Sequence, residues 1–595
     1  MLKSSYIITL LSSIGLFNSC SASFLNVNDI NSSIVYPKKL DTTYGNYLAG
    51  RLAHIRQDYE KASYYYVKSI DKGLDNKDVI GKTYIILASL GKVDDSVKYA
   101  KIARQKGDEN SFIDVITSVN EFKKGNYALS RAVMSKIEDK SYKTIIYPLF
   151  SAWSYAGENN YNGAKKELEA ISKSDEMFTV YHLHSGLIAE YFGDKEAAQK
   201  HYQIIINNKA NDISFRALQL ISNFMLRNGK KDDALNLIGR YYGSSNIKEM
   251  LTSLNQKIKE STKKSSPIIN SAQDGISEVF LEVGLLFKTI PAGFDYAQIY
   301  IAFSQYFNKD NDVAKMAIAG LFDDRMLYDL SNKYYDSISR KSEMYYPAKM
   351  KIAQNLFAQE KYAEAIEILK ELLKYDANNF QVLFNLGEVS RFSNNQDKAI
   401  EYYKKAIENI FYETERYWPV YYALAISYDK NNDWMSAEKN LEQALKLSNR
   451  HPNVLNYLGY SWLKIGIKTD AAIEYIVEAY EKNPNDGFIM DSVGWIFYKI
   501  GDYDNAITFL ERASELDPQN AVISDHLGDA YWQGGRKTEA LYQWKQALRQ
   551  KDEFNEVNKK RVKSKIKTGL AENKVLTLDN KRTSDLLKNV ENVTH

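Results

Sequence analysis

The sequence predicts an all-α fold, an α-solenoid in which pairs of antiparallel helices stack along the chain. The first observation is a fixed interval between small residues: Gly494 and Gly528 are 34 residues apart, and so are Gly501 and Gly535. The second is that alanines repeat in the same phase, namely Ala472, Ala506 and Ala540, and then Ala479, Ala513 and Ala547. A period of this length indicates stacked helical units.

Each small residue has a place in such a unit. Gly494 falls in the first helix where it crosses the second, and the alanines of the second helix let the two helices approach closely. Gly501 falls where the first helix ends, a position that favours a left-handed residue. Pro484 and Pro518 follow second helices and stop them. The period and these positions match the tetratricopeptide-repeat (TPR) pattern of helix–turn–helix units.

The same phase extends toward the N-terminus in two blocks. The first small residue of each expected second helix continues the C-terminal block through Ala437, Ala399, Ala365 and Ser331, and in a poorly formed repeat at Ala297. The N-terminal block contains Ala62, Ser96, Ser130, Ala164, Ala198 and Ala234. Because the phase is lost between Ala234 and Ala297, we expect about thirteen TPR repeats in two arrays, six before the break and seven after it. The alternative is one superhelix with a long loop.

The rest of the chain is divided by composition. The stretch after Ala234 is rich in Ser and Lys and reads as a linker. A basic helix with six Lys and Arg residues between 559 and 567 follows the last repeat. We expect it to be a polar capping helix, because the core of a terminal repeat must be covered. The alternative is that it binds nucleic acid or anionic lipid. The predicted parts are a signal peptide (1–19), a tether (20–40), an N-terminal TPR array (41–242), a linker or degenerate helix (243–276), a C-terminal TPR array (277–551), a basic capping helix (552–570) and a disordered tail (571–595).

The N-terminus has the layout of an export signal. A short positive start is followed by an apolar run from Tyr6 to Phe17, which is too short to span a bilayer comfortably. The chain has one cysteine, Cys20, directly after this run. The segment Phe17–Cys20 resembles a bacterial lipobox, although Leu16 lies one residue early, and this predicts that Cys20 is lipidated. Ser21 after it favours the outer membrane by the bacterial sorting rule. The alternative is a plain secretory peptide cut after Ala22 or Ser23.

The composition gives no support for catalysis. The chain has 78 basic and 75 acidic residues, so its net charge of +3 gives no strong overall attraction to nucleic acid. Seven histidines and one cysteine leave little material for metal sites. Gly81-Lys82-Thr83 imitates a phosphate-binding loop, but Asn76 stands where that loop needs glycine. We therefore predict no enzyme activity, no cofactor and no metal.

A partner-binding surface is expected on the first helices of the last repeats, which line the concave groove of a TPR stack. Aromatic side chains offer flat contact area, and Asn, Asp and Lys can pair with an extended peptide. The alternative is that Trp495 and Trp532 pack between neighbouring repeats. The candidate residues are Tyr422, Asn456, Tyr460, Asp491, Trp495, Tyr498, Lys499, Asp525, Asp529 and Trp532. This groove is too acidic to resemble the Lys-and-Asn carboxylate clamp of chaperone-binding TPR domains.

Four segments carry a family resemblance: Asn453–Trp462, Asp491–Trp495, Asp525–Trp532 and, in the opening repeat, Tyr44–Arg51. They resemble a proteobacterial family of large exported TPR proteins. The resemblance covers nearly the whole chain and is tightest over 450–548. The family includes outer-membrane lipoproteins that hold a periplasmic carboxyl-terminal processing protease and deliver its substrates. The resemblance implies an adaptor on the periplasmic side of the outer membrane, or soluble in the periplasm. The alternatives are a structural scaffold of an envelope assembly or secretion complex, and a cytosolic regulator.

Overall fold

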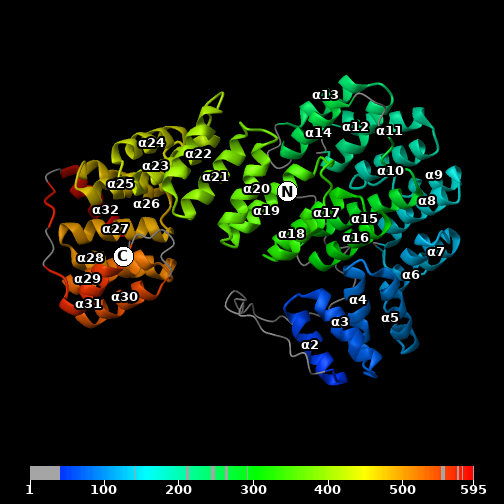
Figure 1. Ribbon diagram of the computed structural model, residues 1–595, viewed down its shortest axis with the longest axis horizontal. Helices are drawn as coiled ribbons and strands as arrows, with labels where there is room; N and C mark the ends of the chain where they lie inside the picture. Colours follow the sequence, from blue (N-terminus) through cyan, green and yellow to red (C-terminus); the bar gives the residue numbers. More distant parts are fainter. Residues whose placement is uncertain are drawn as a thin grey trace. The chain divides into compact units, whose positions relative to one another are not determined.

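The computed structural model describes residues 41–140, 142–208, 213–242, 248–261, 266–290, 293–550, 557–571, 575–578 and 581–593 (Figure 1). Every regular element in these ranges is a helix, which confirms the predicted all-α solenoid. The helices form two compact units that divide after Asn355, inside helix α19 (Tyr345–Ala358). The predicted signal peptide and tether lie outside the described residues.

The first unit contains six helix pairs, from α2/α3 to α12/α13, in the described part of the chain before α14. Its helices are α2 (Thr43–Ile55), α3 (Tyr59–Asp71), α4 (Lys77–Ser89), α5 (Val93–Gln105), α6 (Phe112–Lys123), α7 (Tyr127–Met134), the π-helical turn η2 (Tyr142–Ile146), α8 (Tyr147–Gly157), α9 (Tyr161–Glu169), α10 (Phe178–Tyr191), α11 (Lys195–Asn207), α12 (Phe215–Arg227), α13 (Lys231–Arg240), α14 (Lys248–Glu260), α15 (Ala272–Lys288), α16 (Phe294–Phe307), α17 (Asp312–Asp323) and α18 (Tyr328–Asp336).

The second unit continues the pairs through α29/α30 and ends in two further helices. Its helices are α20 (Tyr362–Leu373), α21 (Phe380–Phe392), α22 (Gln396–Glu408), the 3-10 turn η4 (Glu415–Tyr417), α23 (Trp418–Lys430), α24 (Trp434–Leu447), α25 (Pro452–Ile465), α26 (Thr469–Lys482), α27 (Gly487–Ile500), α28 (Tyr503–Leu516), α29 (Ala521–Gln533), α30 (Lys537–Arg549), α31 (Lys559–Thr568) and α32 (Lys581–Val593). Among the described residues after α14, helices pair as α15/α16, α17/α18 and from α21/α22 to α29/α30, and α15/α16 around Ala297 forms a complete pair.

The glycines of the first helices lie where the sequence places the helix crossings. A Cβ atom at Gly494 would lie 2.6 Å from Cγ of Leu510, and one at Gly528 would lie 2.5 Å from Cδ1 of Trp544. Gly387 faces Tyr403 in the same way, at 2.3 Å. Contacts this short exceed what a packed interior tolerates. Close packing within each pair therefore requires glycine at these positions.

The turn between the paired helices has the same backbone conformation along the chain. Gly501 and Gly535 have φ angles of 82° and 83°, as predicted for the residue that ends the first helix. Six described turns without a glycine keep this conformation, among them those with Met326 at 57° and Glu360 at 60°. The left-handed region is costly for such residues. The repeat geometry thus persists where the sequence signal for the turn is absent.

The seventh pair folds back on the first six repeats. Within unit 1, α15 packs on α8 and α10, and α16 packs on α4 (Figure 1). Both helices are apolar around most of their circumference, and residues such as Phe280 and Phe303 are fully buried. Phe280 stacks on Phe307, which meets Phe122 of α6 edge to face. The first helices of the N-terminal repeats are therefore occupied by the chain itself.

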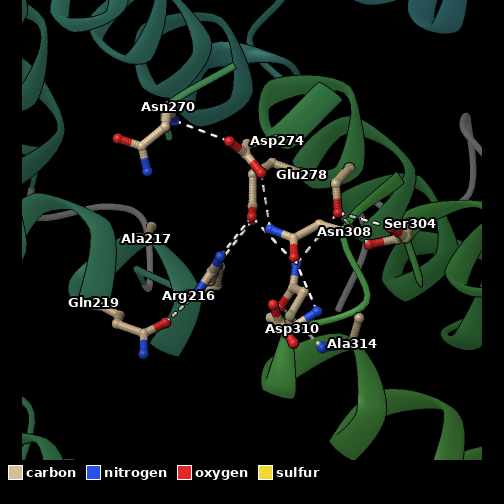
Figure 2. Close-up of polar contacts among 12 residues, drawn as sticks. Arg216, Ala217, Gln219, Asn270, Asp274, Glu278, Ser304, Asn308, Asp310 and Ala314 are labelled. Atoms are coloured by element: carbon tan, nitrogen blue, oxygen red, sulfur yellow. Dashed lines mark hydrogen bonds and ion pairs between the residues drawn. The ribbon is translucent and has the colours of Figure 1, made fainter. Parts of the chain in front are cut away.

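A buried polar network fixes α15 in this place (Figure 2). The guanidinium of Arg216 on α12 binds Glu278 of α15 in a bidentate pair, with N–O distances of 2.8 and 2.5 Å. Arg216 also donates to Gln219, and Nδ2 of Asn311 donates to Oε1 of Glu278 at 3.2 Å. Paired and hydrogen-bonded charges of this kind are tolerated in an interior, whereas a single one is not. The network joins α12 to α15 and to the start of α17.

The structure differs from the predicted division at three places. Within 243–276, predicted as a linker or degenerate helix, helix α14 buries Leu251, Leu254 and Ile258 against α12 and α13, so this helix is packed. The boundary between compact units lies near residue 355 instead. Within the predicted disordered tail, α32 packs on α26 and buries Leu587 and Val590. Both helices carry short apolar stripes of 3-4 spacing within otherwise charged segments.

Candidate functional site

The candidate residues lie on the first helices α23, α25, α27 and α29 of unit 2, and we call the side that they share the first-helix face. Tyr422 is on α23, and Asn456 and Tyr460 are on α25. The remaining seven are Asp491, Trp495, Tyr498 and Lys499 on α27, and Asp525, Asp529 and Trp532 on α29. The structure thus places the whole set on four successive first helices, but their surroundings divide it into two parts.

On α23 and α25 the face is aromatic and half-buried. Trp418 stacks on His451, with ring centroids 4.6 Å apart, and meets Tyr422 edge to face at 5.9 Å. Tyr422 in turn meets Tyr457 of the next repeat at 5.8 Å. The Tyr457 hydroxyl donates to Asp429 at 2.8 Å, which fixes its ring. These contacts form a continuous strip of aromatic side chains across two repeats.

Asn456 lies beside this strip and has an unusual polar atom. Its Oδ1 atom is removed from water and accepts no hydrogen bond within the described part of the chain. Buried acceptors are normally paired, because an unpaired one costs about 1–3 kcal/mol. A bound molecule can satisfy this acceptor only after the Asn456 side chain turns its oxygen toward the surface.

On α27 the candidate residues pack against the next repeat. Trp495 stacks on Tyr498 with centroids 4.5 Å apart and on His526 of α29 at 4.0 Å. His526 Nδ1 lies 2.9 Å from both carboxylate oxygens of Asp491. Burial lowers the pKa of His526, but Asp491, with Asp525 and Asp529 behind it, outweighs that effect, so the pKa is raised. Asp491 and Tyr498 are buried, so these residues hold two repeats together.

On α29 two aspartates are covered by the C-terminal helix. Lys565 of α31 reaches Oδ1 of Asp525 at 2.7 Å and Oδ1 of Asp529 at 2.6 Å. Trp544 of α30 also donates to Asp529, at 2.9 Å. Burial and the neighbouring Asp525 raise the pKa of Asp529, and Lys565 opposes this. Because Asp529 is only 1% exposed, it offers no surface to a partner.

The segment after α31 covers the end of the face. The indole of Trp532 donates to the carbonyl of Leu570 at 2.9 Å and its ring packs on Gly569. The carbonyl of Lys499 accepts a hydrogen bond from the amide of Leu576 at 2.8 Å. Burial and the nearby Arg561 lower the pKa of the Lys499 ammonium. The chain then reaches α26, where Thr583 donates to Asp470.

The first-helix face therefore has an accessible part and a covered part. Tyr422, Asn456 and Tyr460 belong to the accessible part. Asp491, Tyr498, Asp525, Asp529 and Trp532 are engaged within the chain, and Trp495 bridges two repeats as the alternative interpretation expected. The sequence reading missed Trp418, His451, His526 and Lys565. Lys565 stood out as one of several lysines in a basic helix, but nothing in the sequence distinguishes the one that is buried.

No metal centre accompanies this face. Among the described residues, no group of three His, Cys, Asp or Glu side chains is placed to hold a metal ion. Unit 1 has a cavity of about 580 Å³ next to Arg216, but the polar groups of that cavity pair with one another, for example Gln219 with Glu343 at 3.2 Å. None of the described helices combines the length and apolar composition that a bilayer crossing requires.

Comparison with known families identifies the repeats. The family model described as "TPR repeat" matches residues 494–535, and the model "Tetratricopeptide repeat" matches 350–410 and 422–487. These three segments of the chain match tetratricopeptide repeats. The matched segments carry the 34-residue glycine and alanine pattern and include most of the first-helix face.

The TPR relatives come from distant organisms. "TPR repeat-containing protein PA4667" of Pseudomonas aeruginosa is 26% identical over 185 residues, which is 31% of this chain and 30% of that protein. Anaphase-promoting complex subunit 3 of Schizosaccharomyces pombe is 29% identical over 92 residues, 16% and 14% of the two chains. The chain spans less than a third of each of these curated relatives. Among solved structures, the Cut9 and Hcn1 hetero-tetramer has 14% identity and a TM-score of 0.36, covering 89% of this chain and 96% of that one.

Proposed function

We propose that the protein is a non-enzymatic scaffold that binds a protein partner through the accessible part of the first-helix face. The observation that carries this proposal is the aromatic strip of Trp418, Tyr422 and Tyr457 next to the unpaired Oδ1 atom of Asn456. Repeat arrays present extended surfaces of this kind to other proteins. The segments that match TPR repeats support the same proposal, because TPR repeats generally bind protein partners.

The chemistry fits an extended segment of a partner. Aromatic rings supply large contact area with little conformational entropy to lose, and they dominate binding energy at interfaces. A backbone N–H of an extended peptide is a suitable donor for Asn456 Oδ1, since it satisfies the acceptor without changing the helix. The partner is therefore expected to place an apolar side chain on the strip and an amide hydrogen on Asn456.

We further propose that this scaffold works in the bacterial envelope. The proposal rests on the export-type N-terminus with Cys20 and on the resemblance to exported TPR proteins. In this form Cys20 carries a lipid at the periplasmic side of the outer membrane, and the partner is a periplasmic protease or its substrate. The second candidate, a structural scaffold of an envelope assembly or secretion complex, uses the same face with a different partner.

The test compares variants of the face with a matched control. Tyr422→Ala with Tyr460→Ala should weaken the complex with a partner identified by crosslinking in the native cell, while Tyr542→Ala, an exposed tyrosine on α30, should not. Asn456→Ala is the sharper variant: it should leave the free energy of unfolding unchanged or slightly higher and still reduce affinity. Unchanged affinity in both face variants, the Tyr422→Ala and Tyr460→Ala double variant and Asn456→Ala, would refute this binding face. Co-purification of a protease favours the adaptor over the structural scaffold.

A further inference from the structure

Part of the first-helix face of α27 and α29 is covered by a non-helical stretch of the chain. Residues 569–571 and 575–578 belong to this stretch, and we call these described residues the strap. The helix on one side of the strap, α31, is held by the ion pairs of Lys565, and the helix on the other side, α32, packs on α26. The strap therefore lies on the face between two helices that are anchored independently of it.

The face holds the strap through main-chain groups. The Trp532 indole donates to the carbonyl of Leu570 at 2.9 Å, and Nε2 of Gln533 donates to the next carbonyl of the strap at 2.6 Å. The amide of Leu576 donates to the carbonyl of Lys499 at 2.8 Å. Hydrogen bonds to main-chain groups do not depend on the side chains of the bound segment, so a segment of another protein can form the same three bonds.

The apolar contacts of the strap are looser than those of its flanking helices. Leu570, Leu576 and Leu578 are only partly buried against the core of unit 2. Cγ2 of Val575 would lie 3.1 Å from a Cβ atom at Gly501, yet the valine is 52% exposed. Helix α32, by contrast, buries its contacting leucine and valine almost completely. The strap is thus held less firmly than the helices at its two ends.

The face beside the strap carries positive charge. In the described part of the chain, no carboxylate lies within ion-pair distance of the Lys499 ammonium. Burial lowers the pKa of this ammonium, and the positive charge of Arg561 lowers it further. The Arg561 side chain is itself 63% exposed and lies 3.9 Å from Asp529, which Lys565 already neutralises. A carboxylate on a bound segment would therefore be attracted to this part of the face.

We propose that the face under the strap is a peptide-binding site and that the strap is its internal occupant. The partner that fits is a non-helical segment with an apolar side chain at the place of Leu576 and a carboxylate near Lys499. Such a segment displaces the strap, accepts hydrogen bonds from Trp532 and Gln533, and pairs with Lys499. Because the strap is tethered, its effective concentration is high, so a free peptide binds weakly until the strap is released.

Binding of a labelled peptide to the full chain tests the proposal. The probe is a synthetic peptide with the sequence of residues 568–579, and fluorescence anisotropy gives its Kd. Leu570→Asp with Leu576→Asp should release the strap and lower the Kd of the probe at least about tenfold relative to wild type. The control Thr577→Asp, at an exposed position of the strap, should leave the Kd unchanged. Trp532→Phe in the release variant removes the indole donor and should weaken binding about twofold to tenfold.

A second probe tests the carboxylate. In this peptide the two acids of the sequence are replaced by amides, as Glu572→Gln and Asp579→Asn. It should bind the release variant more weakly than the first probe does, and the difference should shrink when the release variant also carries Lys499→Gln. The same affinity for both probes would remove the carboxylate from the proposed ligand.

Hydrogen exchange shows whether each variant is folded and whether the strap is seated. The Leu576 amide should exchange about tenfold or more slowly in the wild type than in the release variant, while α31 and α32 stay protected in both. If the aspartates unfold these helices, Leu570→Gly with Leu576→Gly serves as the release variant.

Three results would overturn the proposal. The first is no binding of the probe to a folded release variant, and the second is equal affinity of the probe for wild type and release variant. The third is a Leu576 amide that is unprotected in the wild type. Because the probe is the chain's own sequence, none of these results depends on whether a partner binds Tyr422 and Asn456.

Discussion

The Nζ atom of Lys565 lies 2.6 Å from Oδ1 of Asp529, and both side chains are almost completely removed from water. This pair joins α31 to the last complete repeat and ends the stack. It explains why a helix that carries so many basic residues packs onto the protein: one lysine neutralises the acidic end of the first-helix face. The pair also leads to the first prediction.

Lys565→Met should destabilise unit 2 by about 3–5 kcal/mol, because it leaves the buried Asp529 with only the more distant and exposed Arg561, at 3.9 Å, as a counter-charge. Lys563→Met, an exposed lysine on the same helix, should change the free energy of unfolding by less than about 0.5 kcal/mol. Urea unfolding of both variants measures the difference. Equal stability of the two variants would show that the pair makes no net contribution.

His526 should make the stability of unit 2 depend on pH. Its pKa is raised in the folded state by Asp491, so its stabilising contribution is complete below its unfolded pKa and is lost as pH rises through the folded pKa. The stability difference between wild type and His526→Gln should therefore be larger at pH 6 than at pH 8.5. Because both proteins contain His182, His201 and His451, whose pKa values are lowered by burial, the contributions of these histidines to the pH dependence cancel in the difference. A difference that is constant with pH would contradict this.

Gly494→Ala should cost about 1–3 kcal/mol, because its Cβ atom would lie 2.6 Å from Leu510 in a packed helix crossing. Gly239→Ala in α13 is the matched control, since a Cβ atom there meets nothing within 4 Å. The control should be neutral or stabilising by up to about 1 kcal/mol, the helix-propensity gain of alanine over glycine. Thermal unfolding of the two variants gives the comparison. If Gly239→Ala lost as much stability as Gly494→Ala, the short Cβ contact with Leu510 would not explain the loss at Gly494.

Palmitate labelling should mark the wild-type protein in a bacterial host and not Cys20→Ala. The reason is that the chain has no other cysteine, so lipidation at the lipobox-like segment has one acceptor. An unlabelled wild type released in soluble form would support a plain secretory peptide. The scaffold function does not depend on this outcome, although its position at the membrane does.

The repeat core could be predicted from sequence because its determinants are local and periodic. Gly494, Ala506 and Gly501 each satisfy one steric demand, and these demands return every 34 residues. The fold-back of α15 and α16 could not be predicted, because it depends on contacts such as Arg216 with Glu278, which are 62 residues apart and follow no period. A degenerate helix was expected where α14 lies, but its packing was not, because its apolar stripe is short and lies outside the repeat phase.

The candidate site was predicted in position but not in accessibility. The repeat phase places Tyr422, Asn456 and Asp529 on the same face and does not show which of them a partner can reach. Only the packing of α31 shows that Asp529 is covered, and only the contacts of Asn456 show an acceptor without a donor. Charge pairing between a terminal helix and the preceding repeat is a tertiary property, and a single sequence carries no sign of it.

The central claim is that the accessible part of the first-helix face binds a protein partner. The most direct measurement is photo-crosslinking in the native cell from a benzoylphenylalanine placed at Tyr422 or Tyr460, with Tyr542 on α30 as the control position. Both face positions should give the same discrete adduct, and the control position should not give it. An adduct pattern that is identical at all three positions, or absent from both face positions and present at Tyr542, would contradict the claim.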